Sequence, residues 1–599
     1  MTAPRNLNEL FLTAVERFGT KKAAVRYKAG DTWKDITHQE LARRVKHTAL
    51  GLRELGVAAG RHVAILSQNR PEWAIVDFAC LSIGCADVSI YPTLPAAQVS
   101  YLLADSDACA VFVENREQYD KVIGVRAEAP QLAHIIVFDV DEGMDAQGVV
   151  SFQELAQRGA AAEGKYPAYR DEALALDPDT LATLIYTSGT TGPPKGAMLT
   201  HRNFCTNVDA ALQVLSIGPE DQCLSAAPLS HSFERMAGHY TMFHAGSTIN
   251  YAQSIEQIPV NLTEVRPTVM IFVPRLYEKL YARVLENAMT SGAVKRRIFF
   301  WARDAAERWA EAKLAKQPVP RVLAAKKAIA DRLVFSKLHA RTGGRIRFFV
   351  SGAAPLNPEI AKFFFAAGLP VVEGYGLTES SPVIAANPLE SIKLGSVGPP
   401  IPGVEVKIAS DGEILARGPN IMKGYYKKPE ATAEALDAEG WLHTGDIGEL
   451  DADGYLRITD RKKDLIVTAG GKKVAPQPIE NMIKTNRFVL NAVMVGDKRK
   501  YPALLVVPDL DAVRAWAAGR GLAAGDDAAL LASPDIVAML EREVMGTLRD
   551  LASFEMPKQM AFLPKDFTIE DGELTPTLKV KRSVVETRYR DVIDGMYQE

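Results

Sequence analysis

The sequence predicts an α/β protein with a large N-terminal domain and a smaller C-terminal α/β domain. Three observations lead to this prediction. A chain of 599 residues is too long to fold around one hydrophobic core. Apolar runs of strand length alternate with helical patterns over more than half of the chain, and after Gly395 the pattern changes to short runs broken by Gly, Pro and Asp. We therefore expect doubly wound βαβ subdomains, a small antiparallel β subdomain and then a second domain.

The first part of the chain alternates between helices and strands. Helical patterns, one of them with a Pro suited to a first turn, cover residues 8–18, 39–55, 71–83, 95–105 and 203–215. Short apolar runs indicate strands over residues 63–67, 88–91, 109–113, 135–138, 181–186, 269–273 and 346–350. Strands that alternate with helices form parallel βαβ layers.

The short apolar runs after Gly395, broken by Gly, Pro and Asp, indicate antiparallel strands over residues 403–408, 412–418 and 454–458. A charged run from Asp460 to Asp464 then leads into a further α/β segment. We expect the domain boundary at this run, which divides the chain into residues 1–462 and 463–599.

Composition and charge are those of an ordinary globular enzyme. The chain is 47% hydrophobic and 24% charged, and its net charge of −3 gives no reason to expect nucleic acid as a partner. The five cysteines include no C-x-x-C pair, which favours reduced thiols in a cytoplasm. No uncharged apolar run approaches the roughly 20 residues of a membrane-spanning helix. We expect a soluble, cytoplasmic protein.

A loop made almost wholly of Ser, Thr, Gly and Pro joins the predicted strand 181–186 to the apolar run 197–199. It carries Thr187, Ser188, Gly189, Thr190, Thr191, Gly192 and Lys195. Hydroxyls and glycine backbone N–H groups donate to oxygen, and the lysine supplies a point charge, which suits a polyphosphate. A flexible surface turn is the alternative. The spacing matches neither the Walker motif nor G-x-G-x-x-G, so a P-loop NTPase and a dinucleotide-binding oxidoreductase lose their main support.

Two later segments add groups that suit a nucleotide. Residues 373–379 place an aromatic ring (Tyr375), a hydroxyl (Thr378) and a carboxylate (Glu379) in a Gly-rich turn. The ring suits a flat base, and the carboxylate suits Mg²⁺. Asp446 and Arg461 offer a carboxylate and a guanidinium for ribose hydroxyls. Taken singly, these residues also fit a core tyrosine, a solvated glutamate and a turn aspartate.

The string from Tyr186 to Gly196, Y-T-S-G-T-T-G-P-P-K-G, resembles the phosphate loop of the adenylate-forming superfamily, and the two later segments match that superfamily in order and spacing. The superfamily includes acyl-CoA synthetases, peptide-synthetase adenylation domains and luciferases. The resemblance implies that Thr187 and Glu379 coordinate Mg²⁺, that Tyr375 stacks on adenine, and that Asp446 and Arg461 hold the ribose. The other implied ATP contacts are Ser188, Gly189, Thr190, Thr191, Gly192, Lys195, Gly352, Ala353, Glu373, Gly374, Gly376 and Thr378.

The end of the chain carries the implied catalytic lysine. The run Thr575 to Arg582 resembles the superfamily's closing segment and selects Lys579, although many relatives have Gly where this chain has Leu578, which leaves Lys581 as a rival. A carboxylate that attacks the α-phosphate of ATP brings two anions together, so cationic groups must neutralise the transition state. A thiol must then arrive from the side that Lys579 occupies. The resemblance resolves this conflict with a mobile C-terminal domain that turns at Lys463 and brings Gly470 and Gly471 to the CoA path.

The segment from Ala227 to Met236 resembles that of long-chain fatty acyl-CoA synthetases and places His231 at the acyl entrance, although a lone His is as often a core residue. The small side chains of residues 350–356 suit a channel or a close-packed crossing. The resemblance thus implies a ligase that converts fatty acid, ATP and CoA into acyl-CoA, AMP and diphosphate through an acyl-adenylate.

Several alternatives stay open. The enzyme stops at acyl-AMP and hands the acyl group to a carrier protein, or it acts on medium-chain or other carboxylic acids. A non-catalytic nucleotide-binding protein on the same fold is a rival that intact Lys195, Glu379 and Lys579 disfavour. A hydrolase has neither G-x-S-x-G nor H-E-x-x-H to support it. The oligomeric state, including a homodimer, is undetermined.

The stretch from Lys295 to Arg347 is strongly basic, with 15 Lys and Arg against 4 Asp and Glu. Large apolar residues, among them Phe299, Trp301 and Trp309, are interleaved with these charges. Such a segment suits peripheral contact with an anionic membrane, where a fatty acid is collected. A solvated helical hairpin packed on the body is the alternative.

Overall fold

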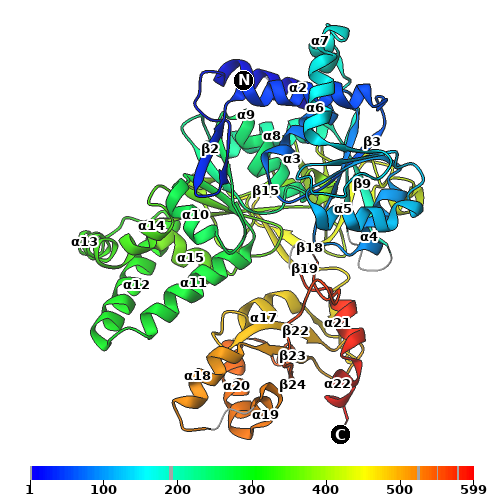
Figure 1. Ribbon diagram of the computed structural model, residues 1–599. Helices are drawn as coiled ribbons and strands as arrows, with labels where there is room; N and C mark the ends of the chain where they lie inside the picture. Colours follow the sequence, from blue (N-terminus) through cyan, green and yellow to red (C-terminus); the bar gives the residue numbers. More distant parts are fainter. Residues whose placement is uncertain (1–2, 188–192, 523–525, 550, 576–578, 599) are drawn as a thin grey trace.

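The computed structural model describes residues 3–187, 193–522, 526–549, 551–575 and 579–598 (Figure 1). The chain forms a large upper body and a smaller lower lobe that begins after the last strand of the body. The predicted residues Ser188, Gly189, Thr190, Thr191 and Gly192 lie outside the described residues.

The first sheet of the body has seven strands in the order β7-β6-β5-β3-β4-β8-β9. Its neighbours pair in parallel except for the antiparallel pair β8–β9. The strands are β3 (His62–Leu66), β4 (Ala86–Ile90), β5 (Ala108–Val113), β6 (His134–Val137), β7 (Val149–Ser151), β8 (Leu181–Thr187) and β9 (Lys195–Thr200).

Helices cover both faces of this sheet. On one face lie α2 (His38–Glu54), α3 (Pro71–Ser82) and α6 (Phe152–Ala161), and on the other lie α4 (Ala96–Asp105) and α5 (Arg116–Val125). The strand β3 shows why its run is wholly apolar: Val63 and Ile65 join the core on the α2 and α3 face, while Ala64 and Leu66 join the core under α4. A strand buried on both faces needs no polar alternation.

The second sheet has eight strands in the order β15-β14-β13-β12-β10-β11-β1-β2, antiparallel only at its two edge pairs. The strands are β1 (Val25–Ala29), β2 (Thr32–Ile36), β10 (Gln222–Ser225), β11 (Thr248–Tyr251), β12 (Val269–Phe272), β13 (Phe348–Ser351), β14 (Val371–Gly376) and β15 (Val383–Ala386). One face packs on α1 (Leu7–Phe18), α8 (His201–Val214), the π-helix η3 (Glu234–Thr241) and α9 (Met242–His244). The other face packs on α10 (Ile258–Val265), α11 (Pro274–Met289) and α15 (Pro358–Ala366).

These sheets confirm the doubly wound prediction. Each predicted helix and strand before Gly395 occurs, with ends displaced by at most two residues. The expected runs did not include β1, β2, β7, β10, β11, β14 and β15. We also correct the expectation of a Gly-rich turn from Glu373: residues 373–376 end β14, because pairing with β13 and β15 satisfies their backbone.

A four-stranded antiparallel sheet, β16-β17-β18-β19, closes the body. Its strands are β16 (Glu405–Ile408), β17 (Glu413–Arg417), β18 (Leu442–Leu450) and β19 (Leu456–Arg461). Strands β16, β17 and β19 match the expected runs. We correct the expectation for the segment with Asp446: it is the middle of β18 and not a turn, because pairing with β17 and β19 satisfies a backbone whose Gly and Asp content disfavours a strand.

The lower lobe contains the hairpin β20 (Ile466–Val467) and β21 (Lys473–Val474) and the sheet β22-β23-β24. That sheet consists of β22 (Val489–Val495), β23 (Ala503–Pro508) and β24 (Gln559–Phe562). Around it lie α17 (Pro476–Ile483), α18 (Leu510–Ala518), α19 (Asp527–Ala532), α20 (Pro534–Thr547), α21 (Arg582–Arg588) and α22 (Arg590–Gly595), as Figure 1 shows. Separate apolar clusters hold this lobe together.

Within the part of the chain that the structure describes, none of the helices combines the length and the apolar character that crossing a bilayer requires.

Candidate active site

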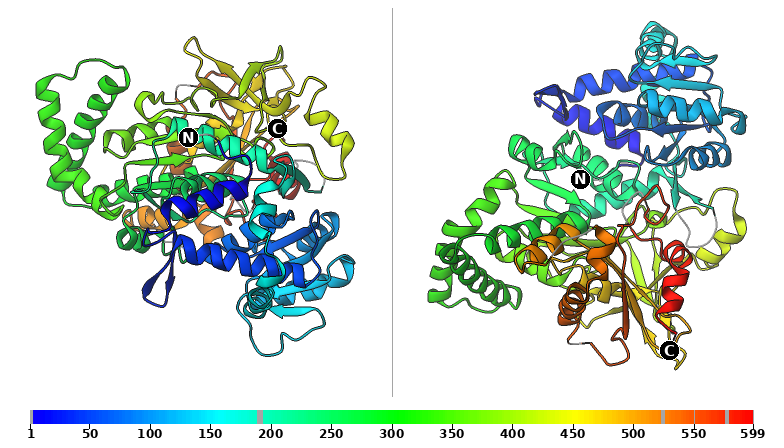
Figure 2. Two further views of the ribbon diagram at one scale, coloured as in Figure 1. Left: turned by 90° about the horizontal axis from the view of Figure 1, so that it is seen from above. Right: turned by 60° about the horizontal axis from the view of Figure 1, so that its bottom comes forward.

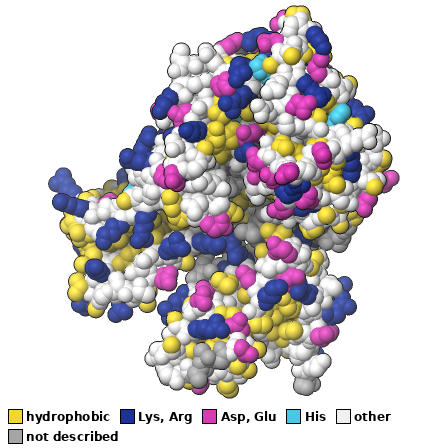
Figure 3. All heavy atoms as spheres, in the orientation of Figure 1, with side chains coloured by type: hydrophobic (Ala, Val, Ile, Leu, Met, Phe, Trp, Pro, Cys, Tyr) yellow, Lys and Arg dark blue, Asp and Glu magenta, His cyan; other side chains and the backbone are white. Residues whose placement is uncertain are grey.

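A cleft of about 3650 Å³ lies between the body and the lower lobe and is lined from both (Figure 3). The carboxyl ends of β8, β13 and β14 meet there, as ligand sites of open α/β sheets do. The sequence-predicted residues on its walls are Thr187, Lys195, His231, Gly352, Ala353, Glu373, Gly374, Tyr375, Gly376, Thr378, Glu379, Asp446, Arg461, Lys463 and Lys579. Residues from seven separate segments of the sequence therefore converge on one cavity.

The ends of the predicted phosphate loop are held by strand pairing. Thr187 ends β8, Lys195 begins β9, and the two residues are register partners. The Thr187 hydroxyl lies 3.3 Å from Glu379 Oε1 and 3.4 Å from the Lys195 carbonyl oxygen. The hydroxyl and carboxylate that the sequence assigned to Mg²⁺ are thus neighbours.

Tyr425 is a residue of this site that the sequence reasoning missed. Its hydroxyl donates to Glu379 Oε1 at 2.8 Å, and Lys195 Nζ lies 5.2 Å from the centre of its ring. Backbone hydrogen bonds of Lys423 and Tyr426 to β9 bring the segment alongside the loop. An aromatic residue far from the other motifs gave no local signal, because only this pairing places it there.

Tyr375, Asp446 and Arg461 form one connected group. The Tyr375 hydroxyl donates to Asp446 Oδ2 at 2.7 Å, and Arg461 Nε lies 3.3 Å from Asp446 Oδ1. Burial raises the pKa of Asp446, and the Arg461 charge opposes that rise. Antiparallel register between β18 and β19 sets Asp446 opposite Arg461.

Gly376 is required at its position. A Cβ there would lie 1.7 Å from the Pro382 carbonyl oxygen, so any side chain would push β14 away from β15. Glu373 lies in the same strand, and burial raises its pKa to about 8. At neutral pH it therefore brings little negative charge to a site predicted to hold phosphates.

The segment with His231 forms another wall of the cleft. Ser232 Oγ lies 3.3 Å from Thr378 Oγ1, and the Phe233 backbone N–H donates to His231 Nδ1 at 3.1 Å. Burial and the nearby Lys579 charge lower the pKa of His231 to about 3, so the imidazole is neutral. The Phe233 ring lies over Gly352, where a Cβ would meet it at 2.9 Å. The small residue at 352 thus makes room for an aromatic wall.

Lys579 reaches the cleft from the lower lobe. Burial and the Arg461 charge lower its pKa to about 8, and Asp446 opposes that shift. Its charge also lowers the pKa values of Asp446 and His231, two residues of the body. Lys581 lines the cleft as well. Both lysines of the closing segment therefore reach the cleft.

Lys463 lies in the short connection between β19, the last strand of the body, and β20, the first strand of the lower lobe. Just before it, Lys462 Nζ pairs with Asp411 at 2.6 Å and with Glu413 at 2.9 Å, which ties that residue to the antiparallel sheet. The Lys463 side chain is exposed. Gly470 and Gly471 are also exposed, and neither lines the cleft in this arrangement.

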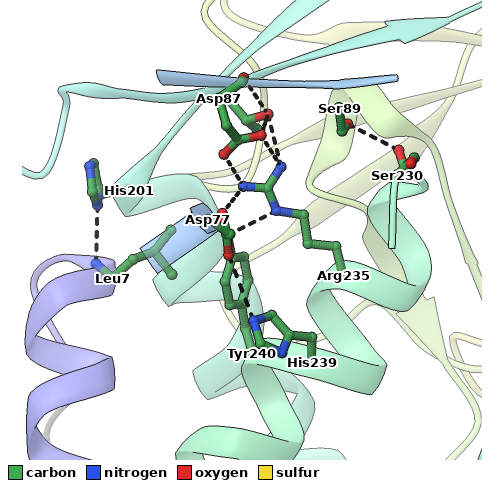
Figure 4. Close-up of polar contacts among 10 residues, drawn as sticks. Leu7, Asp77, Asp87, Ser89, His201, Ser230, Arg235, His239 and Tyr240 are labelled. Atoms are coloured by element: carbon green, nitrogen blue, oxygen red, sulfur yellow. Dashed lines mark hydrogen bonds and ion pairs between the residues drawn. The ribbon is translucent and has the colours of Figure 1, made fainter. Parts of the chain in front are cut away.

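A buried ion cluster around Arg235, four residues after His231, anchors the His231 segment (Figure 4). Arg235, at the start of η3, pairs with Asp77 of α3 and Asp87 of β4, and all three side chains are fully buried. Arg235 also donates to the Tyr240 hydroxyl and to Thr183 Oγ1, both at 2.9 Å, and Thr183 lies in β8. The cluster joins α3 and η3 to two strands of the first sheet, β4 and β8, and β8 ends at Thr187. Sequence reasoning missed it because nothing local marks Arg235 as buried.

We expect Arg235→Leu to lower the free energy of unfolding by about 3–5 kcal/mol, because it leaves two carboxylates buried without their partner. Urea unfolding followed by tryptophan fluorescence measures this change. The control is Arg202→Leu, which removes an exposed pair with Asp179 and should cost less than about 1 kcal/mol. Equal losses in the two variants would contradict a structural role for the buried cluster.

Two known protein families together match most of this chain. The family described as AMP-binding enzyme matches residues 11–426, and the AMP-binding enzyme C-terminal domain matches residues 463–599.

Curated proteins are similar over nearly the whole chain. The long-chain-fatty-acid–CoA ligase FadD15 of Mycobacterium tuberculosis is 38% identical over 95% of this chain and 93% of its own length. The peroxisomal long chain acyl-CoA synthetase 6 of Arabidopsis thaliana is 34% identical over 95% of this chain and 82% of its own. The long-chain-fatty-acid–CoA ligase ACSBG1 of Bos taurus is 32% identical over 100% of this chain and 85% of its own.

Solved structures share the fold at lower identity. The anthranilate CoA ligase AuaEII, in complex with anthranoyl-AMP, is 19% identical with a TM-score of 0.73, over 99% of each chain. ATP-bound MatB from Rhodopseudomonas palustris is 23% identical with a TM-score of 0.69, over 98% of this chain and 99% of its own. Both likenesses concern the fold alone.

Proposed function

The chain belongs to the AMP-binding enzyme family, and from this membership we infer that it activates long-chain fatty acids as an AMP-forming acyl-CoA ligase. Fatty acid and ATP give an acyl-adenylate and diphosphate, and CoA then displaces AMP to give acyl-CoA. Curated relatives named as long-chain-fatty-acid–CoA ligases or synthetases, similar over 95% or more of this chain, support this inference.

One observation carries the proposal: Lys579 from the lower lobe enters the same cleft as Thr187, Glu379 and Asp446 from the body. In the first half-reaction the fatty carboxylate attacks the α-phosphorus of ATP, and the bond to the leaving diphosphate breaks. Negative charge grows on the α-phosphate oxygens in the transition state. The Lys579 ammonium offsets this charge electrostatically and forms no covalent bond.

The remaining residues have binding and orienting roles in this proposal. Lys195 and Thr378 contact phosphate oxygens, together with Ser188, Gly189, Thr190, Thr191 and Gly192. The Tyr375 ring lies against adenine, and Asp446, held by Tyr375 and Arg461, accepts hydrogen bonds from the ribose. The walls of the nucleotide site are Gly352, Ala353, Glu373, Gly374 and Gly376.

The donor set at Glu379 suits Mg²⁺. A carboxylate and the neighbouring Thr187 hydroxyl are oxygen ligands, and Mg²⁺ in nucleotide sites takes one or two protein oxygens beside phosphates and water. When bound, the ion would neutralise phosphate charge. Tyr425 donates to the same carboxylate and fixes its direction.

The acyl chain enters beside His231 and Phe233. A neutral imidazole and an aromatic wall suit an apolar chain whose carboxylate points toward Thr378. The second half-reaction needs a different arrangement, since Lys579 fills the side from which the thiol arrives. We place the domain boundary between residues 462 and 463, with Lys463 as the hinge. Rotation there would bring Gly470 and Gly471 to the CoA path.

The test is AMP release from ATP with saturated fatty acids of increasing length, measured with and without CoA. We expect CoA-dependent AMP release and acyl-CoA, with the largest kcat/KM for long chains. Stoichiometric acyl-AMP that CoA does not consume would instead indicate transfer to a carrier protein. Preference for medium or other carboxylic acids would overturn the long-chain assignment, and no ATP–diphosphate exchange with any acid would overturn the enzyme assignment.

We also propose a cytoplasmic location, since all five thiols are buried and unpaired, as in a reducing compartment. A homodimer is part of the proposal, and sedimentation equilibrium tests it.

A further inference from the structure

The basic stretch of the sequence forms a helical arm that projects from the body (Figure 1 and Figure 2). It consists of α12 (Ala293–Leu314), α13 (Arg321–Ala330), the π-helix η4 (Asp331–Phe335) and α14 (Ser336–Arg341). The inner face of α12 buries Phe299, Ala302, Ala306 and Ala310 in the core shared with α15. The arm is thus anchored to the body.

The inner face of α13 and η4 packs against α12. Lys327 is buried, with its ammonium 4.9 Å from the Trp309 ring and paired with Asp331. Ala330 and Phe335 are buried beside it. The orientation of α13 is therefore fixed, and its opposite side faces away from the protein.

That outer side carries a stripe of large aliphatic residues. Val322, Ile329 and Leu333 are 69%, 51% and 51% exposed. Their spacing of seven and then four residues places them on one side of a helix. Single exposed aliphatic residues are ordinary, but three that line one side of the same helical segment are not.

Basic residues flank the stripe on both sides. Arg321, Lys326, Arg332 and Lys337 are exposed, and Asp331, the acidic residue of the segment 321–341, is engaged inward by Lys327. Figure 3 shows dark blue and yellow side chains gathered on this arm at the left of the molecule. This surface therefore combines exposed apolar groups with positive charges around them. A partner that matches it has negative charges at its surface and an apolar interior beneath them.

The cleft of the candidate active site extends to the base of the arm. Leu276, Leu280 and Met289 of α11 and Phe300 of α12 line that extension. Near it, Val294, Ile298 and Trp301 are exposed beside the run Lys295 to Arg297. The cleft that holds His231 thus reaches α12, with apolar and charged residues of α11 on its wall.

We propose that the outer face of α13 and η4, defined by Val322, Ile329, Leu333 and their basic flank, docks on an anionic lipid bilayer. The aliphatic stripe enters the boundary between head groups and acyl chains, and the flanking charges contact lipid phosphates. The role of this docking rests on the proposed function: fatty acids partition into bilayers, and the cleft proposed to bind them reaches α12 of the same arm.

The experiment is co-sedimentation of the full chain with vesicles of phosphatidylcholine containing about 30% phosphatidylglycerol, and with pure phosphatidylcholine. We expect binding to the anionic vesicles that weakens as salt rises. The variant Lys326→Gln/Arg332→Gln/Lys337→Gln should bind them about 100-fold more weakly, at roughly fivefold per charge. The variant Val322→Ser/Ile329→Ser/Leu333→Ser should lose about tenfold or more, because its aliphatic groups no longer partition.

The matched control is Lys34→Gln/Arg61→Gln/Lys558→Gln, which removes three exposed charges elsewhere and should bind as the unchanged protein does. Unchanged binding of the two arm variants, or an equal loss in the control, would overturn the proposal. So would a concentration-dependent dimer that the serine variant abolishes, since a second copy would then cover the stripe.

Loss of vesicle binding and loss of ligase activity can be distinguished by separate measurements. CoA-dependent AMP release with a water-soluble medium-chain acid should be unchanged in both arm variants, because neither touches the cleft residues assigned to ATP. Vesicle binding by a protein without any ligase activity would leave the docking surface in place and remove the proposed function. Ligase activity without vesicle binding would do the reverse.

Discussion

Lys579→Ala should lower the rate of acyl-adenylate formation by about 100- to 1,000-fold, because it removes the ammonium that faces the α-phosphate when charge develops there. Acyl-CoA formation from supplied acyl-AMP and CoA should stay within about twofold, since that step needs the lower lobe turned away. Fatty-acid-dependent ATP–diphosphate exchange measures the first half-reaction. Product formation from synthetic acyl-AMP measures the second.

Lys581→Ala is the matched control, since Lys581 also lines the cleft and its substitution removes the same charge. It should keep both half-reactions. Survival of both half-reactions in Lys579→Ala would refute the assignment, and a larger loss in Lys581→Ala would exchange the roles of the two lysines.

The same assignment gives a pH dependence. Burial and Arg461 lower the pKa of Lys579 to about 8, so the ammonium is lost as pH rises above that value. We expect kcat/KM for adenylation to fall about tenfold per pH unit above pH 8, with no such limb in the second half-reaction. Lys579→Arg keeps its charge at any accessible pH and should move this limb upward.

Lys463→Pro should leave adenylation within about threefold and slow thioester formation by about tenfold or more. Lys579 already lines the cleft in this arrangement of the lobe, so we expect the first half-reaction to need no rotation at residue 463. Proline fixes φ near −65° and so restricts rotation at the hinge that the second half-reaction requires. Single-turnover measurements of the two half-reactions separate these effects.

Lys463→Ala removes the same charge but keeps the backbone free, so it should behave almost as the unchanged protein does. If the proline variant slows both half-reactions equally, Lys463 is not the hinge. If the alanine variant reproduces the proline effect, the side chain and not the backbone matters.

The alternation of helices and strands could be predicted because its signals are local. The wholly apolar run of β3 and the proline that opens α3 each report their own surroundings within a few residues. The loop after β8 was recognisable for the same reason: hydroxyls, glycines and a lysine in one short run define a phosphate-binding composition without any distant partner. Resemblance to a known family then linked separate motifs that physical reasoning alone left as alternatives.

Other features could not be predicted because their partners are remote in sequence. Tyr425 contacts Glu379 only because the segment from Lys423 to Tyr426 pairs with β9, and Asp446 lies in a strand only because β17 and β19 flank it. Arg235 is a buried cation whose partners, Asp77 and Asp87, lie more than a hundred residues earlier. Its burial depends on the packing of two sheets, which no local pattern encodes.

The sequence by itself determined the fold class, most strand and helix positions before Gly395, and the family, because periodicity, turn chemistry and motif spacing are properties of short segments. Only the tertiary structure decided that Lys579 of the lower lobe lines the same cleft as Asp446, that Arg235 anchors the His231 segment, and that α13 turns its aliphatic stripe outward. Each of these depends on which distant surfaces pack together, and the free energy of that packing is shared among residues that the sequence keeps far apart.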